Sequence, residues 1–233
     1  MKTKTALITG GTKGIGKAIA TMLAEKNVRL VLNYFSDEDE ANKTKSQLKA
    51  RLIQADVSTY EGANKILDSI DTLDYIVFNV GITDRTAFGQ INIEAWEKVL
   101  RTNLTIPFFI LQHLKEKIAI NGRVIFITSI SGIVPDSVSI SYGVSKAGEN
   151  MLVKYLAKEF ASKRITVNAI APGYVQTDWH KNKSSAQIKR ISEKSVMKRF
   201  ATTQEIANVV KMLIENEYVT GQIIRVDGGF GLA

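Results

Sequence analysis

The stretch Thr9-Gly10-Gly11-Thr12-Lys13-Gly14-Ile15-Gly16 decides the fold. It lies between a short apolar run, Thr5–Thr9, and a segment, Gly16–Lys26, whose apolar residues repeat at helical spacing. Glycines at a strand-to-helix junction let the chain turn sharply and let its backbone approach a ligand closely. The helix that follows offers free N–H groups and the positive end of its dipole to a phosphate. We interpret the stretch as a pyrophosphate-binding turn, with a purely structural turn as the alternative.

Short apolar runs alternate with longer amphipathic segments along the rest of the chain. Most runs are continuous and rich in Val and Ile, which is typical of strands covered on both faces. The alternation predicts an α/β fold: a single-domain, Rossmann-type, doubly wound parallel sheet of about seven strands with helices on both faces, spanning residues 1–233. The predicted strands are Thr5–Thr9, Val28–Asn33, Arg51–Gln54, Tyr75–Phe78, Val124–Thr128, Thr166–Ile170 and Ile223–Val226. The predicted helices are Gly16–Lys26, Glu38–Leu48, Tyr60–Ile70, Ile93–Lys117, Ile140–Ser162 and Thr203–Glu215, the fourth bending near Pro107.

Composition narrows the class of protein. Of the 233 residues, 45% are hydrophobic and 23% charged, the balance of a folded globular chain. The absence of cysteine excludes disulfides, thiolate zinc sites and cysteine nucleophiles, and we expect no metal site. No apolar run approaches the roughly 18 residues of a membrane span or forms the apolar core of a secretion signal. We expect a cytoplasmic protein without membrane association.

The net charge of +8 raises the question of acidic partners. The densest basic region, His180–Arg199, has no interleaved aromatic residues of the kind that stack on single-stranded nucleic acid. We interpret it as the solvated face of a surface helix and expect no nucleic-acid partner. Nucleic-acid binding stays a third hypothesis, resting on charge alone.

Tyr142 and Lys146 lie four residues apart in a predicted helix and so share one face. Alone, such a pair is typical of an exposed surface. Ser129, however, follows the predicted strand Val124–Thr128, and ligands of open α/β sheets bind at the carboxyl ends of strands. Hydrogen bonding to nearby backbone is the alternative role for Ser129, and equally for Asn103 in the predicted helix.

Taken together, these residues resemble a known family. The turn spacing is Gly10-x-x-x-Gly14-x-Gly16, and Ser129 precedes Tyr142-x-x-x-Lys146. This pattern resembles the short-chain dehydrogenase/reductase family, and Asn103 matches its fourth catalytic position. The resemblance implies an NAD(P)-dependent oxidoreductase acting on CH–OH/C=O groups, with Asn103, Ser129, Tyr142 and Lys146 as catalytic residues.

The chemistry of these residue types suits hydride transfer to a carbonyl. The reaction leaves a developing alkoxide that needs a proton, which Tyr142 would donate. A nearby ammonium favours the phenolate, and Lys146 supplies that charge. Ser129 would donate a hydrogen bond to the carbonyl oxygen. By resemblance, Lys146 also holds the nicotinamide ribose and Asn103 positions a water that relays protons.

The resemblance extends over nearly the whole chain and predicts the cofactor contacts. One departure follows the fourth strand, where Phe78-Asn79-Val80-Gly81 replaces the family's Asn-Asn-Ala-Gly; we expect altered packing rather than lost binding. The predicted cofactor-binding residues are Gly10, Thr12, Lys13, Gly14, Ile15, Gly16, Asn33, Tyr34, Asp56, Val57, Asn79, Gly81, Tyr142, Lys146, Pro172, Gly173, Val175 and Thr177.

The second strand favours NADP(H) over NAD(H). NAD specificity usually needs an acid at the end of that strand, but the first acid here is Asp37, in the expected helix cap. Lys13 in the turn can pair with a 2′-phosphate. An exposed turn lysine is the alternative interpretation.

Within the family, the chain most resembles bacterial 3-oxoacyl-(acyl-carrier-protein) reductases, through Asn79–Thr83 and Ala171–Asp178. The resemblance implies fatty acid biosynthesis and a 3-oxoacyl thioester substrate, with an acidic carrier protein suiting the basic surface and Lys163 and Arg164 contributing to a patch. A sugar, steroid or other small ketone or alcohol is the alternative substrate. A catalytically silent NADP(H)-binding regulator is the alternative function.

The region 177–199 is expected to form a substrate lid. Trp179 and His180 lie where they can face the substrate, although we expect His180 at the surface and interpret His113 as structural. The resemblance also implies a homotetramer, with the long helices Ile93–Lys117 and Ile140–Ser162 and the C-terminal end at its interfaces. The apolar face of Met151, Leu152, Tyr155 and Leu156 fits either an interface or the intrachain core.

Overall fold

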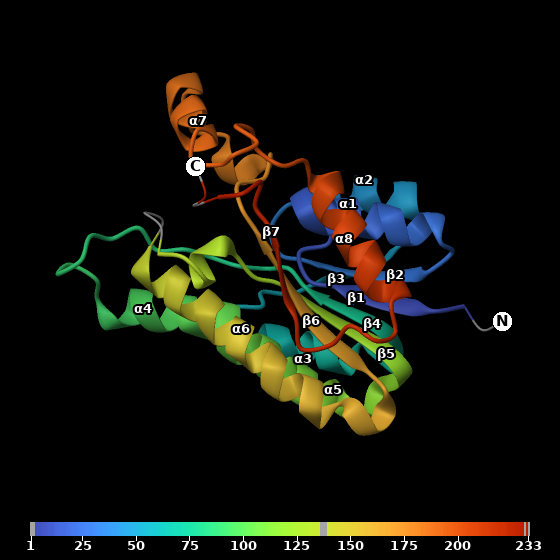
Figure 1. Ribbon diagram of the computed structural model, residues 1–233. Helices are drawn as coiled ribbons and strands as arrows, with labels where there is room; N and C mark the ends of the chain where they lie inside the picture. Colours follow the sequence, from blue (N-terminus) through green and yellow to red (C-terminus); the bar gives the residue numbers. More distant parts are fainter. Residues whose placement is uncertain (1–2, 136–138, 231, 233) are drawn as a thin grey trace.

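The computed structural model describes residues 3–135, 139–230 and 232 (Figure 1). One parallel sheet runs in the order β3-β2-β1-β4-β5-β6-β7. Because β4 returns beside β1, the sheet is wound in two directions from this pair, as predicted. The strands are β1 Thr5–Ile8, β2 Arg29–Tyr34, β3 Arg51–Gln54, β4 Leu73–Phe78, β5 Ile118–Ile127, β6 Thr166–Pro172 and β7 Ile223–Val226.

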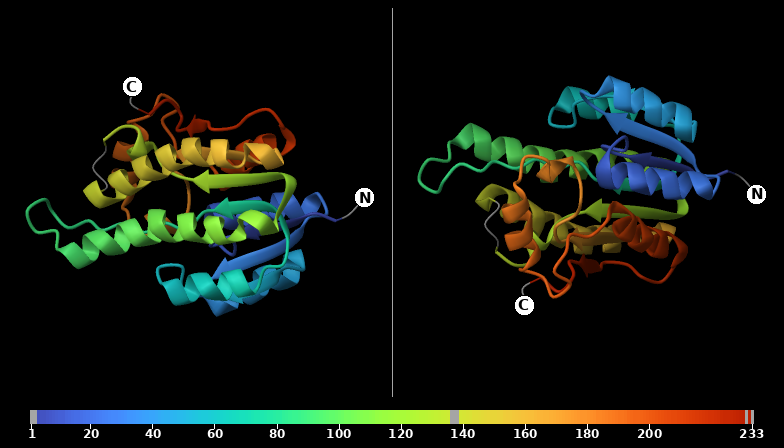
Figure 2. Two further views of the ribbon diagram at one scale, coloured as in Figure 1. Left: turned by 90° about the horizontal axis from the view of Figure 1, so that it is seen from below. Right: turned by 90° about the horizontal axis from the view of Figure 1, so that it is seen from above.

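Helices cover both faces of the sheet (Figure 2). Helices α1, α2 and α8 lie on one face, and α3, α5 and α6 lie on the other. The helices are α1 Gly14–Glu25, α2 Glu38–Leu48, α3 Tyr60–Asp68, α4 Ile93–Leu100, α5 Ile106–Leu114, α6 Ile140–Glu159, α7 Ser185–Ser192 and α8 Thr203–Glu215.

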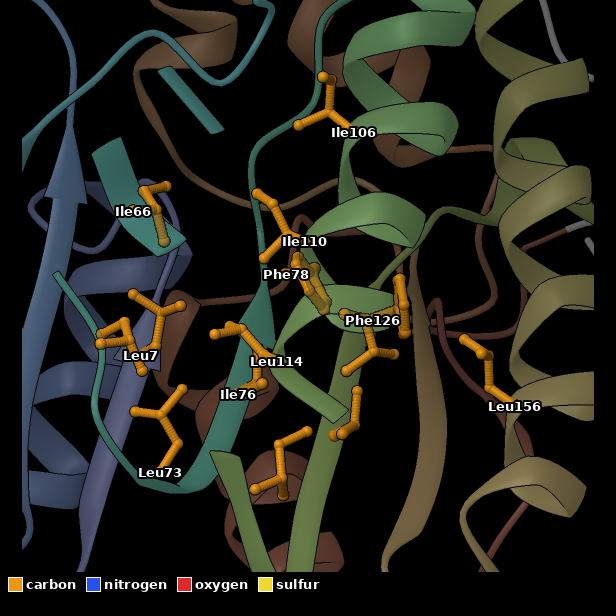
Figure 3. Packing of buried hydrophobic residues seen from close by; sticks show 14 of the residues in the cluster. Leu7, Ile66, Leu73, Ile76, Phe78, Ile106, Ile110, Leu114, Phe126 and Leu156 are labelled. Atoms are coloured by element: carbon orange, nitrogen blue, oxygen red, sulfur yellow. The ribbon is translucent and has the colours of Figure 1, made fainter. Parts of the chain in front are cut away.

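The continuous apolar strands contribute side chains to two hydrophobic cores, one on each face of the sheet. Side chains alternate along a strand, so Leu7 joins the core under α5 and α6 whereas its neighbour Ile8 joins the core under α1 and α8. In the first core, Phe78 and Phe126 stack with ring centroids 4.8 Å apart (Figure 3). Each such buried side chain contributes about 1.5–3 kcal/mol relative to exposure.

The predicted helix Ile93–Lys117 is helical throughout but changes type along its length. Helix α4 passes into a π-helical turn, Arg101–Thr105, and α5 restarts at Ile106 with Pro107 in its first turn. Proline has no N–H to donate, and the first turn of a helix is where that loss costs least. The change of helix type falls next to Pro107, where the sequence predicts a bend, and Asn103 lies in the π-turn.

Other boundaries differ modestly from the prediction. Strand β5 begins six residues earlier than expected, at Ile118, and pairs irregularly with β4 near Leu73. On α6, Leu156 joins the core and Met151 and Tyr155 are exposed, so the apolar face divides between the two expected uses. None of the helices in the described ranges is both long and apolar enough to cross a membrane.

The carboxyl ends of β1, β4, β5 and β6 meet at one edge of the sheet, where the predicted site residues follow them. Lys163 and Arg164 instead precede β6 and lie at the amino edge. Lys163 forms an ion pair there with Glu116, with Nζ of Lys163 and Oε2 of Glu116 2.7 Å apart. The expected contribution of Lys163 and Arg164 to a carrier-binding patch stays a prediction.

Candidate active site

The glycine turn is shaped by close backbone packing. Gly10 and Gly14 have φ of +60° and +49°, in the left-handed region that favours glycine. At Gly16, a Cβ atom would collide with the carbonyl oxygen of Gly10. The turn therefore leaves an open cradle at the amino end of α1, where a pyrophosphate fits.

Asn79 and Asn33 hold this turn from either side. The Asn79 amide nitrogen donates to the carbonyls of Thr9 and Gly10, at 3.1 and 3.2 Å. Asn33 is buried, and its amide nitrogen donates to backbone carbonyls of Tyr34, Ile53 and Ala55. The Asn33 side-chain oxygen also accepts from the Gly10 N–H at 3.4 Å, so both side chains support the cradle.

Lys13 forms an ion pair with a carboxylate. Its ammonium forms an ion pair with Asp37, which also caps α2 by accepting a hydrogen bond from the Glu40 N–H at 3.1 Å. The placement of Asp37 in the helix cap is confirmed. The Lys13 ammonium and the Glu40 N–H together hold the pKa of Asp37 below its ordinary value. Lys13 is half exposed, beside the turn, at the place where it was expected.

The remaining predicted cofactor contacts lie around the same edge. Thr12 is buried, and its carbonyl accepts from Thr44. Asp56 follows β3 and accepts from the Ser58 N–H, and Val57 beside it is buried. Val80, one of the two departures from the family pattern, packs against the core beside Gly10. Phe78 stacks in the core, so the apolar packing expected of both departures is confirmed.

A cavity at the carboxyl edge brings three of the four predicted catalytic residues together. Ser129 enters from the end of β5, and Tyr142 and Lys146 enter from the first turns of α6, which Ser139 caps. The cavity is lined by Ile15, Asn79, Gly81, Ile127, Thr128, Ser129, Ile130, Ser131, Tyr142, Lys146, Pro172, Gly173, Tyr174, Val175, Thr177, Trp179 and His180.

Lys146 and Tyr142 are close enough for their charges to interact. The Lys146 Nζ lies 5.8 Å from the centroid of the Tyr142 ring and donates to the Ile127 carbonyl at 3.1 Å. Lys146 is only 1% exposed. Burial lowers the pKa of Lys146, but Glu149 and Tyr142 outweigh burial and hold that pKa above its ordinary value. A charged ammonium is thus maintained beside the phenol.

Asn103 lies behind the cavity rather than in its wall. Its amide nitrogen donates to the Ile82 carbonyl and to Ser145 Oγ, at 3.0 and 2.9 Å, and its oxygen accepts from the Ile82 N–H at 2.9 Å. The π-turn therefore fastens the loop after β4 to helix α6. This network orients the helix that carries Tyr142 and Lys146.

Trp179 and His180 both line the cavity, so the expectation of a surface His180 is wrong. The His180 ring packs edge-on against Phe200, with centroids 5.1 Å apart. Burial, together with the charges of Lys183 and Arg85, lowers the pKa of His180 to about 4. A neutral imidazole therefore faces the cavity at neutral pH.

Glu149 is the functional candidate that sequence reasoning missed. It lies three residues after Lys146 on the buried face of α6, with Oε2 2.7 Å from Nζ of Lys146. The i, i+3 spacing was a signal, but a lysine and a glutamate so spaced usually pair on an exposed surface.

Comparisons with known proteins now bear on this geometry. A family model described as enoyl-(acyl carrier protein) reductase matches residues 10–231. Glucose 1-dehydrogenase 2 of Bacillus subtilis (strain 168) is 36% identical, with 98% of this chain and 95% of the relative covered. The 3-oxoacyl-[acyl-carrier-protein] reductase FabG of Aquifex aeolicus (strain VF5) is 34% identical, covering 97% and 96%. The chain belongs to the short-chain dehydrogenase/reductase family.

Solved structures agree with this chain in fold. BdcA in complex with NADPH superposes with a TM-score of 0.91 at 25% identity, covering 98% of this chain and 94% of that one. The Pseudomonas aeruginosa RhlG/NADP active-site complex gives 0.90 at 30% identity, covering 97% and 96%. The Rossmann-type fold is thereby confirmed, and the chain is an NAD(P)-binding oxidoreductase that acts on CH–OH/C=O groups.

Proposed function

We propose that this oxidoreductase is an NADP(H)-dependent carbonyl reductase whose substrate is a 3-oxoacyl thioester. The observation that carries the proposal is one cavity, beside the glycine cradle, lined by Ser129, Tyr142 and Lys146. A proton donor, a hydroxyl for the carbonyl oxygen and a buried cation thus converge at the carboxyl edge of the sheet.

Bound in the cradle, the dinucleotide would supply the hydride. Tyr142 protonates the oxygen of the reduced carbonyl, and the nearby Lys146 ammonium favours the phenolate that remains. Ser129 donates a hydrogen bond to the same oxygen as its charge grows. Lys146 would also hold the nicotinamide ribose, and Asn103 fastens α6 to the loop after β4.

The preference for NADP(H) rests on Lys13. Its ammonium lies beside the cradle, where a 2′-phosphate would replace Asp37 as its anionic partner. The structures of BdcA with NADPH and of RhlG with NADP give this proposal general support.

Replacing Lys13 by alanine is expected to weaken NADPH binding about tenfold, the value of a charge-assisted hydrogen bond to phosphate. NADH binding should change by less than about twofold, because NADH has no 2′-phosphate with which Lys13 can pair. Fluorescence titration with each cofactor measures both constants. Lys26→Ala, at the opposite end of α1, is the matched control. An equal loss for NADH and NADPH would contradict the assignment of Lys13 to the phosphate.

A thioester substrate is supported by the relatives and by the lid. Several relatives are named as 3-oxoacyl-[acyl-carrier-protein] reductases, at 32–34% identity. Helix α7, which follows the cavity-lining residues Trp179 and His180 in the chain, carries exposed Lys189 and Arg190. These charges suit an acidic carrier protein. The identity of 36% to a glucose 1-dehydrogenase keeps a sugar as the second candidate substrate.

A panel of substrates tests the proposal. NADPH oxidation is measured with acetoacetyl thioesters, both small and carrier-linked, and with an enoyl thioester; NADP reduction is measured with glucose. We expect turnover of the acetoacetyl thioesters, with a lower KM for the carrier-linked form. Turnover of glucose or of a simple ketone without any of acetoacetyl thioesters would refute the thioester proposal. NADPH binding without turnover of any compound would favour a regulator.

We further propose the lid at residues 177–199, a cytoplasmic location and a homotetramer. Exposed apolar side chains on α4, α5 and α6, including Ile93, Phe109, Met151 and Tyr155, support an interface on that face. Their placement agrees with the helices that the family resemblance assigns to subunit contacts.

A further inference from the structure

Glu149 occupies a position where a carboxylate is costly. The buried row of α6 continues from Lys146 and Glu149 to Val153 and Leu156, which belong to the apolar core. Glu149 is only 1% exposed. An ionised carboxylate in such surroundings is strongly disfavoured unless a partner compensates for its lost hydration. Its presence therefore depends on what it contacts.

The partner is the ammonium of Lys146. Nζ and Oε2 are 2.7 Å apart, and within the described part of the chain no other donor reaches this oxygen. The same ammonium donates a hydrogen bond to the backbone carbonyl of Ile127. The Lys146 ammonium is therefore held between the end of β5 and Glu149 of its own helix.

The elements packed against α6 bring no competing charge to this pair. The π-turn contributes neutral Asn103, β6 contributes apolar Val167 and Ala169, and Arg101 donates instead to the Ser58 carbonyl. The charged residues of α4, which are Glu94, Glu97 and Lys98, are exposed. Among the described residues, the titratable groups that act on Lys146 are thus Glu149 and Tyr142.

We propose that Glu149 is a positioning residue: it anchors the ammonium of Lys146 and sets the pH range over which the site works. The effect on turnover rests on the proposed function, whereas the electrostatic effect does not. Burial lowers the pKa of Lys146 and the Glu149 carboxylate opposes this, so removing the carboxylate lowers the pKa of Lys146. The ammonium that the site needs is then lost at a lower pH, and the working range moves toward acid.

The protonation state of Glu149 determines the pH range in which removing its carboxylate has an effect. Burial raises the pKa of Glu149 to about 7, although Lys146 opposes the rise. The carboxylate is therefore largely charged above neutrality and largely protonated well below it. Variants that remove it should differ most from the unmodified enzyme on the alkaline side.

The test is a spectroscopic titration that needs no substrate. The Nζ resonances of the lysines are followed against pH by NMR in the full chain, and the signal of Lys146 is the one lost in Lys146→Met. In Glu149→Gln, the midpoint of this signal is expected at least about 1 pH unit lower, because the carboxylate 2.7 Å from Nζ is gone and burial acts unopposed. Glu149→Leu removes the same charge and leaves no buried polar group, so we expect the same shift. It replaces the glutamine variant in the test if that variant folds poorly. Glu159→Gln, exposed on the same helix, is the matched control and should leave the midpoint unchanged.

The pH profile of kcat/KM, with any carbonyl substrate that is turned over, is expected to move in the same direction. Glu149→Asp keeps the charge and should restore most of the profile. Unchanged midpoints in both Glu149→Gln and Glu149→Leu, even with lowered thermal stability, would overturn the proposal and leave Glu149 a structural residue. A shifted midpoint without thioester turnover would uphold it and instead refute the thioester substrate.

Discussion

Replacing Tyr142 by phenylalanine is expected to lower kcat about 10³-fold, with the dissociation constant of NADPH unchanged. The change removes the hydroxyl that donates the proton, and positioned general acids contribute about 10²–10⁴-fold to rates. The ring remains to pack beside Trp179, with which its centroid distance is 6.2 Å. Steady-state kinetics and cofactor fluorescence measure the two quantities.

The matched control is Tyr218→Phe, which removes the hydroxyl of a tyrosine that is 97% exposed. It should leave kcat and cofactor affinity unchanged. A Tyr142→Phe enzyme that retains more than about a tenth of the kcat would contradict the assignment of Tyr142 as the general acid.

Replacing Lys146 by methionine is expected to reduce stability as well as activity. The change leaves the Glu149 carboxylate buried without its cation, and breaking a buried pair on one side costs about 3–5 kcal/mol. The pKa of Glu149, already raised by burial, rises further without Lys146. A group with a raised folded pKa stabilises the fold at low pH and loses that contribution as pH rises through the folded pKa. The loss of unfolding free energy should therefore be larger near about pH 8 than near about pH 5.

Urea denaturation at the two pH values measures this loss. The double variant Lys146→Met/Glu149→Leu should recover most of the stability but none of the activity, because it removes the unpaired charge and leaves the lysine absent. Lys154→Met, exposed on the same helix, should be close to neutral. A Lys146→Met loss that is the same at both pH values would contradict the assigned pairing with Glu149.

Local patterns in the sequence were sufficient for most of the fold. Strands β3 and β7 and helices α2 and α8 have the predicted bounds, because turn residues or caps stop each element sharply. Tyr142 and Lys146 could be placed on one helical face because their spacing of four fixes that relation. Ser129 could be added because the carboxyl end of a strand in an open sheet is where ligands bind.

The remaining features depend on contacts between distant segments. Asn103 forms hydrogen bonds with Ile82 and Ser145. No local sequence pattern predicts the π-turn that places Asn103 between them. His180 looked like a surface residue in a basic region, but Tyr174 and Phe200 enclose its ring. Glu149 has the spacing of an ordinary helix charge, and only its burial in the folded chain distinguishes it. In each case burial by residues far along the chain decided the role.

The most direct test of the central claim follows the hydride. The enzyme is incubated with NADPH carrying deuterium at the transferable position of the nicotinamide and with an acetoacetyl thioester, and the product is analysed by mass spectrometry. We predict a 3-hydroxyacyl thioester that carries the deuterium on its hydroxyl-bearing carbon, formed by the unmodified enzyme and about 10³-fold more slowly by Tyr142→Phe. Recovery of the thioester unreduced and unlabelled with the unmodified enzyme, while NADPH is bound, would contradict the account.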